Sequence, residues 1–183
     1  MGVIKWFYKL RHKDVAEGDI PARYNISLLT GIKKPIRKWF SAVLIPTIPF
    51  SGLRVCCYRL CGYKVGKGTF IGMRCYLDDL CYDKIEIGKN VTISYGVYFA
   101  CHGRKQGHNK IIIKDGAYIG MRASIIAPKG DVVIGEKAII GTMTLVNKSV
   151  PAGITAVGVP CRILEKNAQI PDAQAKNTEN GND

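Results

Sequence analysis

A six-residue repeat runs through the middle of this chain and restricts its possible folds more than any other feature. From Val65 onward an aliphatic or aromatic residue recurs every six positions, in groups of three. That period matches neither the 3.6-residue turn of an α-helix nor the two-residue alternation of a flat sheet. It predicts short strands joined by tight turns, with every third strand stacked on the one below, which is a parallel β-helix of triangular section. The repeating positions are Val65, Ile71, Leu77, Ile87, Ile93, Phe99, Ile113, Ile119, Ile125, Ile134, Ile140 and Val146.

The six-residue step breaks after every third repeat, and these breaks indicate where a functional site lies. The spacing is 10 residues from Leu77 to Ile87, 14 from Phe99 to Ile113 and 9 from Ile125 to Ile134. If three strands make one coil, all three insertions leave the prism at the same corner. Loops can vary without disturbing the stack of a solenoid, so we expect the chemistry at this corner. The largest insertion contains His102 and His108.

The repeats also divide the chain into three parts. We expect residues 1–64 to form a basic, amphipathic and mainly helical cap over the open first coil, because the ends of a solenoid need covering for solubility. Residues 65–164 are expected to form the β-helix, and the segment from Val150 to Gly153 to end its coils. Residues 165–183 are rich in Asn, Asp, Ala and Gln, which predicts a disordered tail.

The positive charge of the chain is concentrated near its N-terminus. The net charge is +13, and residues 1–68 hold 13 Lys or Arg against 3 Asp or Glu, whereas residues 69–183 hold 14 against 11. The basic residues directly before the apolar run 39–45 are Lys33, Lys34, Arg37 and Lys38. This arrangement suits peripheral contact with an anionic membrane, and equally a helix packed on a neighbouring subunit. No nucleic-acid-binding motif accompanies the charge, so nucleic acid is not an expected partner.

The composition argues against several other classes of protein. The longest apolar run, residues 39–50, is 12 residues long and contains Pro46 and Pro49, whereas a membrane-spanning helix needs about 20 residues. No secretory signal is readable in residues 1–10. Seven cysteines form an odd set without the paired spacing of zinc sites, so we expect reduced thiols in a cytoplasmic protein.

The repeats, the loop that contains His102 and the closing run from Gly141 to Leu164 together resemble the left-handed β-helix acyltransferases, which are built from hexapeptide repeats. The galactoside, maltose and polysaccharide O-acetyltransferases are the most similar members, and serine acetyltransferase is a more distant one. The resemblance covers residues 65–164. It implies a left-handed parallel β-helix, a homotrimer with its active sites between adjacent prisms, and acetyl-CoA as acyl donor. We expect no metal, because the cysteines lack the paired spacing of zinc sites.

The resemblance also implies roles for individual residues. His102 stands where the sugar O-acetyltransferases carry their catalytic histidine, which acts as general base. Asp78 and Asp79 match an acidic pair that can bind an acceptor hydroxyl or hold an imidazole in one tautomer, although either can instead cap the following turn. His108 resembles an acceptor-binding histidine of serine acetyltransferases, or is an ordinary loop residue. The positions that match contacts to acetyl-CoA are Met121, Thr142, Asn147, Lys148 and Arg162, of which the last two suit phosphate groups.

Four positions depart from the pattern of these enzymes. Gly103 replaces the usual proline after the histidine, and Met73 replaces an asparagine that the sugar enzymes often carry. Met121 stands where the galactoside enzyme offers a hydroxyl, so the oxyanion donor here has to be a backbone N–H. Glu165 occupies a position where a further arginine is frequent. The departures argue against a simple galactoside or maltose acceptor. They also predict different contacts to the nucleotide end of acetyl-CoA.

These observations predict an acetyl-CoA-dependent O-acetyltransferase that acts on a saccharide hydroxyl during assembly of a surface polysaccharide, in the cytoplasm or peripherally at the inner membrane face. Two alternatives stay open: an N-acetyltransferase of an amino sugar, in which the same histidine deprotonates an ammonium group, and a catalytically silent trimeric scaffold at a membrane surface. A γ-type carbonic anhydrase needs three zinc-ligating histidines. This chain has only His12, His102 and His108, and His12 lies outside the repeats.

Overall fold

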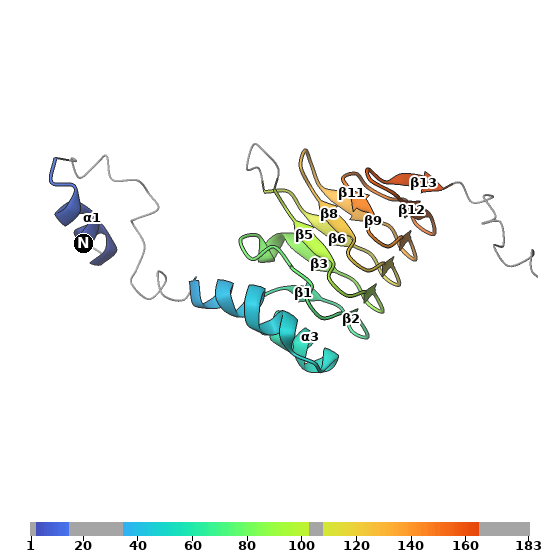
Figure 1. Cartoon of the computed structure of the whole chain (residues 1–183), viewed down its shortest axis with the longest axis horizontal. Coiled ribbons are helices and arrows are strands. Elements are labelled where there is room, and N and C mark those ends of the chain that lie inside the picture. The colour runs from blue at the N-terminus through green and yellow to red at the C-terminus, as the bar shows by residue number, and fades with distance from the viewer. Residues whose placement is uncertain (1–2, 15–34, 103–107, 165–183) are drawn as a thin grey trace, which may run out of the picture.

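The computed structural model of the chain describes residues 3–14, 35–102 and 108–164, and its main body is a stack of three-stranded coils (Figure 1). Face A consists of β1 (Lys64–Val65), β3 (Ile85–Ile87), β6 (Ile111–Ile113) and β9 (Val132–Ile134). Face B consists of β2 (Phe70–Ile71), β4 (Thr92–Ile93), β7 (Tyr118–Ile119), β10 (Ile139–Ile140), β12 (Thr155–Val157) and β13 (Arg162–Leu164). Face C consists of β5 (Tyr98–Ala100), β8 (Ser124–Ile126) and β11 (Leu145–Val146). All strand pairs are parallel except β12 with β13.

The interior of the prism is filled by the residues that define the repeat. On face B, Ile71, Ile93, Ile119 and Ile140 pair in register from coil to coil and are all fully buried. The small residue four positions later is also buried, as Ala123 is after Ile119. In most of the A-to-B and B-to-C turns, the residue just before this small one takes a positive φ. The chain therefore turns sharply between strands of two or three residues. The predicted β-helix of hexapeptide repeats with an N-terminal helical region is confirmed.

The long insertions leave the prism at one corner, as predicted. The residues after Leu77, after β5 and after β8 all connect face C to face A, and Figure 1 shows these connections along one edge of the stack. We name this edge the C–A corner, and the other two edges the A–B and B–C corners. The first insertion contains the short helix η5 (Tyr82–Lys84).

The predicted end of the coils at Val150 to Gly153 is wrong. Val150 bridges to Ile134 on face A, and β12 then pairs with β10 on face B. Pro151 to Gly153 therefore form another A–B turn, in which Gly153 takes a φ of 67° like the glycines of earlier turns. The coils end instead at β13, which reverses direction and pairs antiparallel with β12.

A helical cap covers the start of the stack. Residues 35–39 are α-helical and continue into η3 (Phe40–Leu44) and η4 (Ile45–Thr47), and α3 (Ser51–Leu60) follows. The helix α1 (Val3–Arg11) precedes them in the chain. None of the described helices is long and apolar enough to cross a membrane. Lys33, Lys34, Gly103, Glu165 and the predicted tail 165–183 lie outside the described residues.

Side chains of the cap supply hydrogen bonds that a preceding coil would otherwise provide. The first coil has no coil beneath it, so some of its backbone carbonyls lack ladder partners. The buried Arg54 guanidinium donates to the carbonyl of Ile71 from Nε at 2.8 Å and also from Nη2. Three other side chains donate to first-coil carbonyls: Tyr58 to Cys75, Arg59 to Val65 and Gly66, and Tyr63 to Leu77.

Close contact between coils leads to a prediction at Gly120, in the B–C turn after β7. A Cβ atom at Gly120 would lie 2.6 Å from the backbone nitrogen of Thr142. We expect Gly120→Ala to lower the free energy of unfolding by about 1–3 kcal/mol, because the coils would have to separate. Gly130→Ala is the control, since nothing lies within 4 Å of a Cβ there. Equal denaturation midpoints for the two variants would contradict the prediction.

Candidate active site

Asp78 links the first two coils at the C–A corner. It follows Leu77 at the end of the first coil, and its carboxylate is fully buried. Oδ1 accepts the backbone N–H of Leu80 at 3.1 Å, and Oδ2 accepts the backbone N–H of Cys101 in the second coil at 2.9 Å. These two bonds fix the carboxylate directly beside the residue that follows Cys101.

That residue is His102, whose side chain is partly exposed to solvent and lies beside a buried carboxylate. Its Nε2 lies 3.6 Å from Oδ2 of Asp78, and the side-chain exposures are 41% and 0% respectively. This distance is longer than a direct hydrogen bond, but the carboxylate is close enough to stabilise an imidazolium that forms when the ring takes up a proton. The geometry therefore suits a base that accepts a proton from a ligand at the surface of the corner.

The returning end of the second insertion lies beside His102. His102 and His108 form an antiparallel bridge, and the N–H of Asn109 donates to the carbonyl of Cys101 at 2.8 Å. Nδ1 of His108 lies 3.0 Å from Sγ of Cys81, a buried residue of the first insertion. Burial, together with the negative charge of Asp78, raises the pKa of Cys81 to about 11. The thiol is therefore protonated at neutral pH, and its contact with Nδ1 of His108 joins the two insertions.

Asp79 has different surroundings from Asp78 and faces the cap. Its Oδ1 accepts the hydroxyl of Tyr76, and its Oδ2 lies 3.3 Å from Nζ of Lys38. Burial and the Asp79 carboxylate raise the pKa of Tyr76, so the hydroxyl keeps its proton. Asp79 also borders an open pocket of about 930 Å³ between the cap and the first insertion. Among the described residues, the pocket is also lined by Pro35, Ile36, Arg37, Lys38, Phe40, Leu80 and Tyr82.

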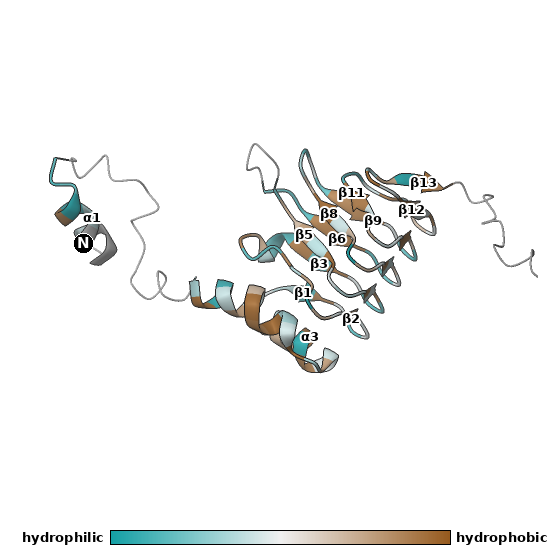
Figure 2. Cartoon of the chain, in the orientation of Figure 1, coloured by the Kyte–Doolittle hydropathy of each residue, from teal (hydrophilic) through white to brown (hydrophobic). Residues whose placement is uncertain are grey.

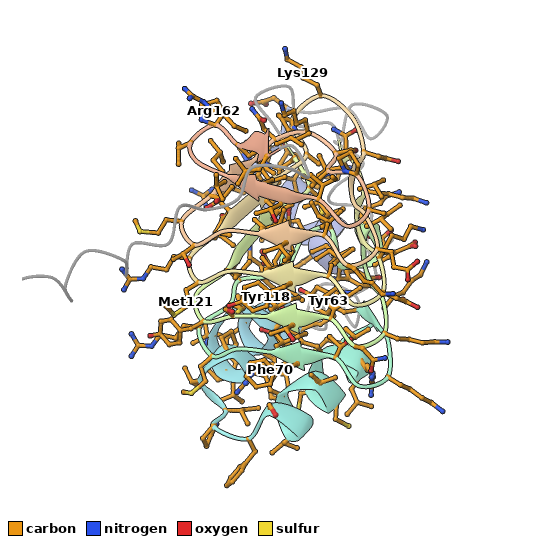
Figure 3. All side chains as sticks on the ribbon, turned by 90° about the vertical axis from the view of Figure 1, so that its right-hand side faces the viewer. Tyr63, Phe70, Tyr118, Met121, Lys129 and Arg162 are labelled. Atoms are coloured by element: carbon orange, nitrogen blue, oxygen red, sulfur yellow. The ribbon has the colours of Figure 1, made fainter. Side chains whose placement is uncertain are left out.

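The five positions predicted to contact acetyl-CoA are all exposed, but they lie on two edges of the prism. Asn147 and Lys148 follow β11 at the C–A corner, two coils beyond His102. Met121 and Thr142 lie at the B–C corner, and Arg162 is on β13. Figure 3 shows Met121 and Arg162 projecting at the same edge of face B. Within one chain, therefore, only Asn147 and Lys148 share the corner of His102.

Met121 also borders a second pocket, of about 520 Å³, at the B–C corner. Met73, another position that departs from the sugar enzymes, lines the same pocket. Its other residues are Pro49, Ser51, Arg54, Phe70, Gly72, Ser94, Tyr95 and Tyr118. Figure 3 shows Phe70 and Tyr118 on face B beside Met121. The lining is thus mainly apolar and aromatic, with Met73 and Met121 where the resemblance implied polar groups.

The sequence reasoning missed several residues of the C–A corner. Cys81 and Asn109 hold the second insertion, the former through His108 and the latter through a bond from its Nδ2 to the carbonyl of Ala127 at 2.7 Å. Lys38 and Tyr76 hold Asp79. For Cys81 and Asn109 the one available signal was their place inside the insertions. Nothing in the sequence pattern connects Lys38 to Asp79.

Comparison with curated proteins identifies relatives of this chain, although no family model matches it. YvoF of Bacillus subtilis, whose name places it among acetyltransferases, is 30% identical over 135 residues, which cover 72% of this chain and 77% of YvoF. Serine acetyltransferase of Bacillus subtilis is 32% identical over 112 residues, and bifunctional protein GlmU of Rubrobacter xylanophilus is 36% identical over 109 residues. These two matches cover 59% and 56% of this chain. They span only 50% of the serine acetyltransferase and 22% of GlmU.

Solved structures share the fold. The hexapeptide-repeat acetyltransferase VCA0836 of Vibrio cholerae, crystallised with acetyl coenzyme A, aligns with a TM-score of 0.60 and 21% identity over 73% of this chain and 87% of its own. A maltose O-acetyltransferase of Clostridium difficile aligns with a TM-score of 0.55 and 24% identity over 77% of this chain and 89% of its own.

Proposed function

Because this chain belongs to the hexapeptide-repeat acetyltransferase family, we propose that it transfers the acetyl group of acetyl-CoA to a hydroxyl group of a saccharide. The observation that carries the proposal is the half-exposed His102 beside the buried carboxylate of Asp78. Transfer from a thioester to an alcohol needs a base for the hydroxyl proton, donors for the tetrahedral oxyanion and a groove for the acyl carrier.

In the proposed mechanism His102 is the general base. It takes the proton of the acceptor hydroxyl as the hydroxyl oxygen attacks the thioester carbonyl carbon. Asp78 stabilises the imidazolium that results, and a backbone N–H stabilises the oxyanion, because the thioether of Met121 has no proton to donate. Collapse of the tetrahedral intermediate breaks the carbon–sulfur bond and releases the thiolate of CoA, which takes the proton from His102.

The division of the carrier-binding candidates between two corners supports a site shared between chains. In a homotrimer, the C–A corner of one chain, with Asn147 and Lys148, would face the B–C corner of its neighbour. Met121, Thr142 and Arg162 would then come from the second chain. Lys148 and Arg162 provide cations for the phosphates of the carrier. The complex of VCA0836 with acetyl coenzyme A supports this choice of donor.

Serine is the second candidate acceptor, and two observations favour it. Serine acetyltransferase is 32% identical over 112 residues, and His108 lies beside His102. Release of free CoA thiol from acetyl-CoA separates the candidates when maltose, galactosides, amino sugars and serine are supplied in turn. The saccharide proposal expects turnover with a sugar hydroxyl, whereas turnover with serine or an amino group alone would replace it.

Binding of the donor is testable without knowledge of the acceptor. Acetyl-CoA at about 100 times its Kd should raise the free energy of unfolding by about 2.7 kcal/mol, because it binds the folded chain alone. Lys148→Ala should need more acetyl-CoA for the same rise in Tm. Lys89→Ala, an exposed lysine at the A–B corner, should respond like the wild type. No rise in Tm at millimolar acetyl-CoA would favour a catalytically silent scaffold.

A further inference from the structure

The helical cap exposes a row of large apolar side chains on both of its helices. On the first segment, Ile36, Trp39 and Val43 recur three to four positions apart, which places them on one side of the helix, and Leu44 is the next residue. On α3 and the residue before it, Leu53 and Leu60 are 53% and 83% exposed and Phe50 is 71% exposed. We name these seven residues the outer cap face: Ile36, Trp39, Val43, Leu44, Phe50, Leu53 and Leu60.

Apart from Ile36, which also lines the pocket beside Asp79, the outer cap face lies on the side of the helices that is not packed on the coils. The opposite sides of the same helices are buried, through Ser41 and Ile45 in the first segment and Arg54, Val55 and Tyr58 in α3. Figure 1 shows both helices crossing the end of the stack with β1 and β2 on one side only, and Figure 2 shows hydrophobic residues along them. Exposed apolar side chains gathered in this way mark a surface that binds something.

The charge of this region indicates what it binds. Residues 20–77 contain no Asp or Glu. Apart from the buried Arg54, their basic residues are Arg23, Lys33, Lys34, Arg37, Lys38, Arg59, Lys64, Lys67 and Arg74. Lys38 and Lys64 pair with Asp79 and Glu86 from outside the segment. The described contacts of Arg59 are to neutral carbonyls, so its charge is not offset. The helix α1 has the same character, with basic residues in its last turn and no acidic residue in its first.

We propose that the outer cap face binds the surface of an anionic lipid bilayer, with the cap helices lying in the interface. Leu, Phe and Trp side chains would enter the boundary between headgroups and acyl chains, and the surrounding cations would contact the headgroups. A second copy of the chain is a poorer occupant, because it would bring two equally basic surfaces together. The inference rests on the cap and does not depend on the proposed catalytic function.

The consequence concerns the C–A corner. Pro35, Ile36 and Lys38 belong to the first cap segment and also line the pocket that Asp79 borders. Asp79 is next in sequence to Asp78, whose carboxylate lies beside His102. A cap that lies on a bilayer therefore keeps the entrance of this pocket close to the headgroups, where a membrane-bound ligand can reach it.

The test is co-sedimentation of the full chain with vesicles. Wild type should bind vesicles of phosphatidylcholine with phosphatidylglycerol at least about tenfold more tightly than vesicles of phosphatidylcholine alone, and salt should weaken the preference. The double variant Leu53→Glu, Leu60→Glu should lose binding by about tenfold or more. The control Val159→Glu changes a residue whose exposure, 70%, lies between those of Leu53 and Leu60, near the far end of the stack. Equal Tm values for all three proteins show that folding is intact.

A second readout places the cap in the interface. The chain has two tryptophans, Trp6 and Trp39, so a Trp6→Phe background isolates Trp39. Its emission should move to shorter wavelength when anionic vesicles are added. The proposal is overturned if wild type binds both kinds of vesicle equally or neither, or if the double variant binds like wild type. A fall in oligomer mass in the double variant, without vesicle binding by wild type, would assign the face to self-association instead.

Discussion

Replacing His102 with asparagine is expected to lower kcat by two to four orders of magnitude, roughly the contribution of a general base, and to leave the affinity for acetyl-CoA nearly unchanged. Asparagine keeps a polar side chain of similar size but cannot take up the acceptor proton. The affinity should survive because the carrier-binding candidates, from Met121 to Arg162, are other residues, and asparagine at position 102 removes none of them. The measurement is release of CoA thiol with the acceptor identified by screening.

Two other histidines provide the comparison for this variant. His12 lies in the segment that follows α1, outside the coils, so His12→Asn should leave kcat at the wild-type value. His108→Asn should raise KM for the acceptor more than it lowers kcat, if His108 binds the acceptor. A His102→Asn variant with wild-type turnover would remove His102 from the role of base. Loss of acetyl-CoA affinity in that variant would indicate instead that the corner had lost its structure.

The coils could be predicted from the sequence because their pattern is local. Each six-residue repeat has one buried aliphatic residue and one small residue four positions later. This pattern directly predicts three short strands in each coil of the prism. The three broken steps were enough to place the insertions at one corner, since each break follows a complete coil. The end of the coils was predicted one turn too early, because a Pro-Ala-Gly run is typical both of a chain end and of a tight turn between stacked strands.

The candidate site was only partly predictable for a related reason. The position of His102 after Phe99 follows from the period, and so does the placement of Asp78 at the same corner of the preceding coil. The bond between Cys81 and His108 joins residues 27 positions apart in two irregular insertions, and no periodicity reports such a pair. The same holds for Lys38 and Asp79, because the cap has no repeat that would fix its register against the first coil.

Arg54→Met is expected to lower the free energy of unfolding by about 2–4 kcal/mol. Arg54 is 1% exposed, and its guanidinium donates to the carbonyls of Ile71 and Ile48. Burial lowers its pKa, but an arginine keeps its charge in proteins, so the bonds are charge-assisted. Methionine fills much of the same volume. The loss of unfolding free energy therefore comes from the two carbonyls that are left without donors. Chemical denaturation measures it, because the cap and the first coil should unfold together.

Arg59→Met is the matched control for this prediction. Arg59 is on the same helix, α3, and also donates to two first-coil carbonyls, those of Val65 and Gly66, but its side chain is exposed. Water can replace its donors, so we expect a loss of less than about 1 kcal/mol. Arg54→Lys should recover only part of the stability, because one ammonium group cannot donate to the carbonyls of Ile71 and Ile48 with the geometry of the guanidinium. Equal losses for Arg54→Met and Arg59→Met would mean that the cap stabilises the stack by apolar packing alone, and that the open edge of the first coil needs no buried donor.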